Sequence, residues 1–112
     1  MPNEEHRHSL RVDANLLVSY RQENSAPSSA GFVRALNLSD RGMLLETPDL
    51  FAPGQTLSFE IMLDFNQIAQ VEGKIVWYKQ QDKGLNRAGI EFPNLSRAQQ
   101  KLIEDQVAGY TG

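Results

Sequence analysis

The stretch LSFEIMLDF (57–65) alternates apolar and polar side chains along most of its length. The apolar members recur at every second position, as Leu57, Phe59, Ile61 and Leu63. Successive side chains of a β-strand point to opposite faces, so a period of two gathers these residues on one buried face. The stretch predicts a half-buried strand, and it favours a fold built from such strands.

Five further segments of the chain have a strand-like pattern. They are residues 10–20, 32–38, 43–47, 68–78 and 87–92. Most connections between them are short and rich in turn residues, which implies antiparallel pairing of neighbours. Closing so small a sheet removes its exposed edges. The sequence therefore predicts an all-β fold, a six-stranded antiparallel β-barrel.

The pattern changes at Ser96, where SRAQ (96–99) has the form of a helix capping box. The Ser96 hydroxyl can accept a hydrogen bond from the Gln99 amide, and the Gln99 side chain can reach back. Apolar residues then follow at nearly helical spacing, and Gly109 is a stop signal. We expect one C-terminal helix over about 96–108, packed on or beside the barrel.

Composition narrows the class of protein. The 112 residues suffice for one domain, and we expect a flexible arm (1–9) followed by the barrel with its helix (10–112). The chain has no cysteine, which excludes disulfides and thiolate nucleophiles. A net charge of −3 argues against binding to duplex nucleic acid. With no apolar run of about 18 residues and no signal-peptide pattern, we expect a cytoplasmic protein without membrane insertion.

Two short motifs carry the candidate chemistry. RHSLR (7–11) spaces two arginines four residues apart, and guanidinium groups suit phosphate oxygens and stack on purine faces. NLSDRG (37–42) combines an amide and a hydroxyl, which can bond polar base edges, with a glycine that permits a tight turn or a close approach. Together they indicate a site for a small anionic nucleotide.

The two motifs in this order resemble the paired signature of the PilZ domain family, R-x-x-x-R followed by D/N-x-S-x-x-G. The similarity extends over nearly the whole chain, including KIVWY (74–78), AGIEF (88–92) and the helix after them. The resemblance implies a six-stranded β-barrel of the split-barrel type that acts as a bacterial receptor for the second messenger cyclic di-GMP. It implies a bound ligand and no separate cofactor.

The family pattern transfers to individual residues of this chain. Arg7 and Arg11 match arginines that grip phosphates and stack on guanine. Asn37 and Ser39 match the positions that face a guanine edge, and Gly42 ends the motif. Two residues are further candidate contacts, His6 and Trp77. Many members of the family carry another arginine at the His6 position, which supports a stacked pair of ligands, so a neutral histidine favours one bound molecule.

Each candidate residue also has a simpler explanation. Arg7 and Arg11 can be solvated surface charges, and NLSDRG can be a hairpin turn alone. Trp77 alternates with Ile75, which favours a place in the core over a ligand contact. His6 and His8 form an H-x-H pair, but no third ligand is fixed nearby, so we expect no metal site.

Two other classes of function remain open. One is an adaptor barrel that binds no nucleotide and uses an exposed apolar face, such as Met43–Leu45. The other is a flavin-type split-barrel enzyme, which we do not expect because no nucleophile has a positioned base. A single-domain receptor must signal through an unidentified protein partner, and ordering of the arm would provide the signal. The resemblance implies control of motility, exopolysaccharide or pili without choosing among them.

Overall fold

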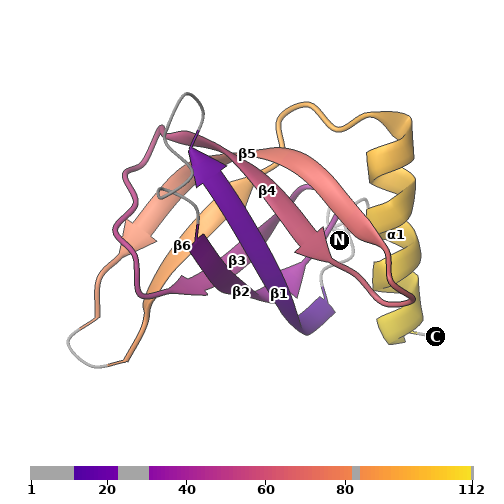
Figure 1. The fold of residues 1–112 in the computed structure, drawn as a ribbon, viewed down its shortest axis with the longest axis horizontal. Helices are drawn as coiled ribbons and strands as arrows, with labels where there is room; N and C mark the ends of the chain where they lie inside the picture. Colours follow the sequence, from indigo (N-terminus) through magenta and orange to yellow (C-terminus); the bar gives the residue numbers. More distant parts are fainter. Residues whose placement is uncertain (1–11, 23–30, 82–83, 112) are drawn as a thin grey trace, which may run out of the picture.

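The computed structural model describes residues 12–22, 31–81 and 84–111. Six strands among these residues close into one antiparallel barrel in the order β1-β2-β3-β6-β5-β4, and one helix follows (Figure 1). The elements are β1 (Val12–Gln22), β2 (Gly31–Leu38), β3 (Gly42–Thr47), β4 (Thr56–Met62), β5 (Ile68–Lys79), β6 (Asn86–Glu91) and α1 (Arg97–Thr111). The predicted fold class is confirmed, whereas the predicted arm of residues 1–9 lies outside the described residues.

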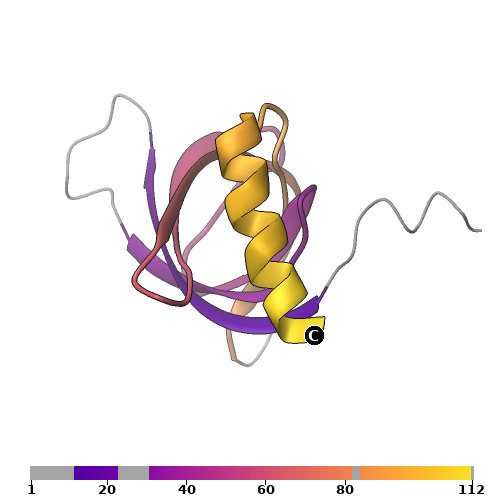
Figure 2. The ribbon, with the colours of Figure 1, turned by 90° about the vertical axis from the view of Figure 1, so that its right-hand side faces the viewer.

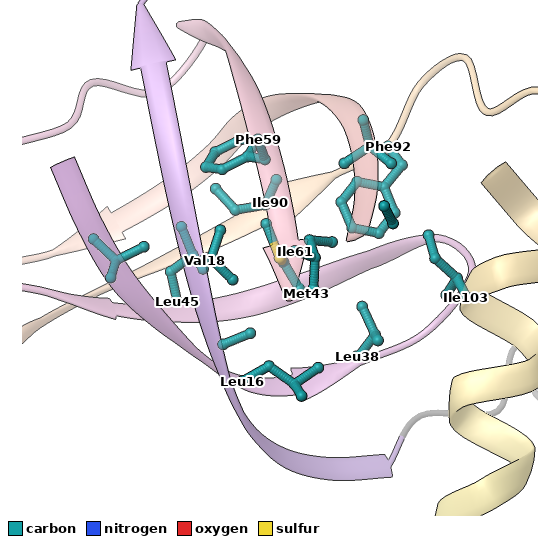
Figure 3. Packing of buried hydrophobic residues seen from close by; sticks show 14 of the residues in the cluster. Leu16, Val18, Leu38, Met43, Leu45, Phe59, Ile61, Ile90, Phe92 and Ile103 are labelled. Atoms are coloured by element: carbon teal, nitrogen blue, oxygen red, sulfur yellow. The ribbon is translucent and has the colours of Figure 1, made fainter. Parts of the chain in front are cut away.

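The barrel interior holds the apolar side chains that the period of two predicted. Leu57, Phe59 and Ile61 of β4 are at most 1% exposed. Figure 3 shows the second and third of these inside the barrel together with Ile90 of β6. Burial of each such side chain contributes about 1.5–3 kcal/mol. The core therefore fixes the register of the strands, and with it the set of side chains that point outward.

Helix α1 lies across one end of the barrel (Figure 2) and inserts Ile103, which is 0% exposed, into the core. The predicted capping box is confirmed. The Gln99 backbone N–H donates to Ser96 Oγ at 3.1 Å, and the Ser96 N–H donates to Gln99 Oε1 at 2.7 Å. The helix continues past Gly109 to Thr111, because Gly109 does not adopt the left-handed backbone that ends many helices. The predicted end was therefore too early.

The β4–β5 turn begins earlier than the sequence pattern predicted. Strand β4 ends at Met62 and not at Phe65, because Phe65 and Asn66 have left-handed φ angles of 62° and 60°. The Gln67 N–H donates to the Asp64 carbonyl at 3.4 Å, which closes a two-residue hairpin turn. The apolar Phe65 extended the apparent strand pattern, yet its side chain is 93% exposed.

Candidate ligand-binding site

The predicted site residues divide into two groups. Arg7, Arg11 and the candidate contact His6 lie outside the described residues, so their roles stay predictions. The NLSDRG motif occupies the end of β2, the β2–β3 turn and the start of β3. The described chain begins at Val12, which pairs with Leu38 next to this turn. The arginine motif therefore ends, in sequence, immediately before a strand that borders the turn.

Asn37 supplies a hydrogen bond at a break in the strand ladder. The β2–β3 register shifts between Ala35 and Asn37, where Leu36 is the extra residue of a β-bulge. A bulge disrupts strand pairing locally. The Oδ1 atom of Asn37 accepts a 3.0 Å hydrogen bond from the Leu44 backbone N–H. Asparagine and aspartate both offer this acceptor, so the hairpin itself explains why the position carries a side-chain oxygen.

Ser39 is committed to the same turn. Its side chain is buried, and its Oγ accepts a 3.1 Å hydrogen bond from the Arg41 N–H. The hydroxyl also lies 3.4 Å from the Gly42 carbonyl, to which it donates. The Ser39 N–H donates to that same carbonyl at 2.9 Å. Ser39 therefore shapes the turn from inside, and contact between its hydroxyl and a guanine edge stays a prediction.

Gly42 is required by a neighbouring strand. It pairs with Glu91 of β6, and a Cβ atom added to it would lie 2.0 Å from the Ile90 carbonyl oxygen. No real Cβ tolerates such an approach to backbone. Its φ angle is not positive, so the turn alone does not demand glycine at this position. The motif glycine therefore permits close contact between β3 and β6 directly behind the turn.

The prediction that Trp77 alternates into the core is wrong. The β5–β6 register shifts between Ile75 and Trp77, and the extra residue, Val76, reverses the facing of the residue after it. Trp77 is 44% exposed. A Cβ atom added to its register partner Gly89 would lie 2.1 Å from the indole Nε1. The indole therefore rests on bare β6 backbone at the outside of the barrel.

One row of register partners connects the turn to this tryptophan. Across five neighbouring strands the row, called the outer row below, consists of Asp13, Asn37, Leu44, Gly89 and Trp77. Sequence reasoning missed three of these residues. A glycine inside the strand RAGIEF was an available signal, since such glycines mark close approach of another group. Nothing in the sequence alone could align Asp13 or Leu44 with the motif, because each of the two strand pairings contains a register shift.

A second row of charged side chains runs beside the outer row on four of its five strands. It consists of Arg34, Glu46, Arg87 and Lys79, and it is called the cationic row. Three cations and one carboxylate give it positive charge in a chain whose net charge is −3. Arg34 also donates to Asn15 Oδ1 at 2.8 Å. An excess of positive charge beside the outer row favours the approach of an anion.

Other parts of the described chain are less suited to this role. An open hollow of about 580 Å³ is lined by residues of β1, β2, β4, β5 and α1, and its lining contains no predicted site residue. Burial, followed by the hydrogen bond to Asp49, raises the pKa of the Tyr20 hydroxyl above its usual range, but Tyr20 packs on the core. Within the described residues no three His, Cys, Asp or Glu side chains gather as a metal site would require.

Comparison with known structures supports the fold. The PilZ domain of YcgR from Escherichia coli, solved with c-di-GMP, matches with a TM-score of 0.76 and 13% identity, covering 94% of this chain and 91% of that one. The Bacillus subtilis inhibitor of motility MotI matches with a TM-score of 0.75 and 19% identity, covering 99% of this chain. This chain spans only 56% of MotI. At such low identities these likenesses establish the fold alone.

A third match is the PilZ domain of CeSA from a cellulose-synthesising bacterium, with a TM-score of 0.67 and 14% identity over 92% of this chain and 99% of that one. No curated protein matches the chain. The part of the chain that the structure describes contains no helix long and apolar enough to cross a membrane. The family model described as PilZ domain matches residues 5–109, nearly the whole sequence, and the chain therefore belongs to the PilZ domain family.

Proposed function

We propose that this chain is a receptor for cyclic di-GMP and that the outer row is the surface on which the ligand rests. The observation that carries the proposal is the row itself. It joins the motif turn, through Asn37, to a half-exposed indole that contacts Gly89, and the cationic row runs beside it. A flat aromatic face, amide donors and nearby cations are the groups that a purine dinucleotide with two phosphates requires.

Each residue then has a distinct role. Arg7 and Arg11 pair with phosphate oxygens and stack on guanine, and Trp77 offers a second face for stacking. Asn37 donates from its amide group to a base, because its oxygen is already bound to the Leu44 N–H. The buried Ser39 holds the turn in position. His6 stands where a further arginine would support a stacked pair of ligands, so one molecule of ligand binds.

The alternative of an adaptor barrel depended on an exposed apolar face in β3, and the structure does not have that face. Met43 and Leu45 are 3% and 0% exposed and belong to the core, so the stretch Met43–Leu45 presents only Leu44 outward. The expected apolar face is absent because every second residue of β3 points into the barrel. The exposed apolar residue that the outer row joins to the motif turn is Trp77, whose indole suits a base as a stacking surface.

Binding becomes a signal through residues 3–11, which hold both arginines. A ligand held by these arginines and by the turn draws the segment onto the barrel and gives a partner protein a new surface to recognise. Amide hydrogen exchange of residues 3–11 should slow when cyclic di-GMP saturates the protein, while exchange in the barrel strands changes little. Protection of this segment without ligand, or none at saturation, would contradict the mechanism and leave the ligand assignment standing.

Titration calorimetry with cyclic di-GMP tests the function directly. Charge-assisted bonds of an arginine are worth about 1.5–3 kcal/mol, so Arg11→Ala should weaken binding about 10- to 150-fold. Its melting temperature without ligand should stay within a few degrees of the parent protein. Cyclic di-AMP has the same phosphates and should bind far more weakly, whereas equal affinity for the two would reduce the site to an unspecific anion site.

A further inference from the structure

In the β2–β3 turn, the side-chain oxygens of Asn37 and Ser39 already accept hydrogen bonds from backbone N–H groups. The Oδ1 atom of Asn37 is bound to the Leu44 N–H, and the buried Ser39 Oγ is bound to the Arg41 N–H. The remaining group, the Asn37 amide nitrogen, has no hydrogen-bond partner within residues 12–22, 31–81 and 84–111. This nitrogen can only donate.

A guanine needs more than donors to be recognised. Its Watson–Crick edge carries one acceptor, O6, beside two donors, N1–H and the N2 amino group, whereas adenine carries an amino donor beside a ring acceptor. The Asn37 amide matches O6. A second protein group, an acceptor within reach of the same base edge, is needed for N1–H and N2–H, and carboxylates are the best acceptors for such paired donors.

Four carboxylates lie on or beside the outer row, and three of them have other neighbours. Asp40 already takes part in an interaction within the protein. Glu46 lies between Arg34 and Arg87 in the cationic row. Glu91 is the register partner of Lys74 on β5. The fourth carboxylate belongs to Asp13.

Asp13 is exposed and has no hydrogen-bond or ion-pair partner among the described residues. It is the direct register partner of Asn37 on the neighbouring strand β1. The Cβ atoms of directly opposed residues in antiparallel strands lie about 4.5–5.5 Å apart. The Asp13 carboxylate and the Asn37 amide can therefore meet one base edge together.

We propose that Asp13 is a specificity-determining residue that accepts hydrogen bonds from N1–H and N2–H of guanine while the Asn37 amide donates to O6. The pair presents acceptor and donor in the order that guanine requires and that adenine opposes. The proposal rests on the proposed function, since it assigns the base contacts of the same ligand. It also places the carboxylate on β1, within two residues of Arg11 in the sequence.

Titration calorimetry with cyclic di-GMP and cyclic di-IMP isolates the contact between Asp13 and the N2 amino group. Hypoxanthine, the base of cyclic di-IMP, keeps O6 and N1–H of guanine and lacks the N2 amino group. The parent protein should prefer cyclic di-GMP by about tenfold or more, the value of one hydrogen bond to a charged acceptor. Asp13→Ala should reduce that preference to about twofold or less. The ratio is the readout, because removing a negative charge near two phosphates shifts the affinity for both ligands alike.

Glu91→Gln is the matched control, since it neutralises another exposed carboxylate beside the motif and should keep the parent preference. Asp13→Asn replaces the carboxylate with an isosteric amide, and its preference for cyclic di-GMP should lie between those of the parent protein and Asp13→Ala. This variant replaces Asp13→Ala in the test if the alanine variant does not fold. If the parent protein binds cyclic di-GMP and Asp13→Ala keeps the full preference, the inference is overturned and the function stands. If Glu91→Gln loses the preference instead, the acceptor is Glu91. If the parent protein binds neither ligand, the proposed function itself fails.

Discussion

The β2–β3 and β4–β5 turns are both hairpin turns of one barrel, but different interactions stabilise them. In the first, side-chain oxygens of Asn37 and Ser39 bind backbone N–H groups, and a glycine admits the neighbouring strand. In the second, two residues with left-handed φ angles make the turn, and Gln106 of α1 binds the Asp64 backbone and carboxylate. The first turn is held by its own side chains and the second by a helix.

The comparison of the two turns shows how a motif that has both a structural and a functional role should be interpreted. Every described residue of the D/N-x-S-x-x-G pattern has a role in the free hairpin, so its presence alone does not prove that a ligand binds. What distinguishes the β2–β3 turn is its surroundings. Asn37 of the β2–β3 turn belongs to the outer row, whereas the β4–β5 turn carries the exposed Phe65 and is bound by Gln106 of α1.

The largest effect is expected from Gly42→Ala. A Cβ at this position overlaps the Ile90 carbonyl, so β3 or β6 must shift, which we expect to cost about 3 kcal/mol or more in the free energy of unfolding. Urea denaturation measures this. Gly109→Ala is the control, because nothing lies within 4 Å of the added Cβ, and it should be neutral or stabilising by up to about 1 kcal/mol. Equal stability of the two variants would refute the close approach.

A smaller effect is expected when the side-chain oxygen of the β2–β3 turn is removed. Asn37→Ala leaves the Leu44 N–H without its acceptor, which we expect to cost about 1–2 kcal/mol because water can partly replace the bond. Asn37→Asp keeps an acceptor, and its free energy of unfolding should be lower than that of the parent protein by less than about 0.5 kcal/mol. Thermal unfolding of both variants without ligand provides the comparison. If alanine and aspartate behave alike, the hairpin does not depend on this oxygen.

The smallest effect is expected at the β4–β5 turn and has the opposite sign. The backbone at residue 65 has a left-handed φ of 62°, which asparagine tolerates better than phenylalanine. Removal of the exposed phenyl ring in Phe65→Asn sacrifices no packing. We expect a gain of about 0.5–1 kcal/mol in the free energy of unfolding. Leu50→Asn, at another exposed apolar residue without a positive φ, should stay within about 0.5 kcal/mol of the parent. Destabilisation by Phe65→Asn would show that the ring packs in solution.

The sequence predicted the barrel because its strands keep a period of two, and it predicted the start of the helix because the capping box is local chemistry. It failed where a single extra residue changes the facing of a strand. Val76 turns Trp77 outward, and no local signal distinguishes that bulge from continued alternation. Asp13 joins the site through the pairing of β1 with β2, and Gly89 joins it through the pairing of β3 with the distant strand β6. Register of this kind is set by the whole core and not by any short stretch.

Trp77 provides the most direct test that the outer row carries the ligand, because it is the single tryptophan of the chain. Its fluorescence should change saturably as cyclic di-GMP is added, with the same midpoint as calorimetry, since a base or phosphate bound on the row alters the exposure of the half-exposed indole. Cyclic di-AMP at equal concentration should leave the emission nearly unchanged. Calorimetric binding of cyclic di-GMP with no change in Trp77 emission would contradict the account and place the ligand elsewhere on the barrel.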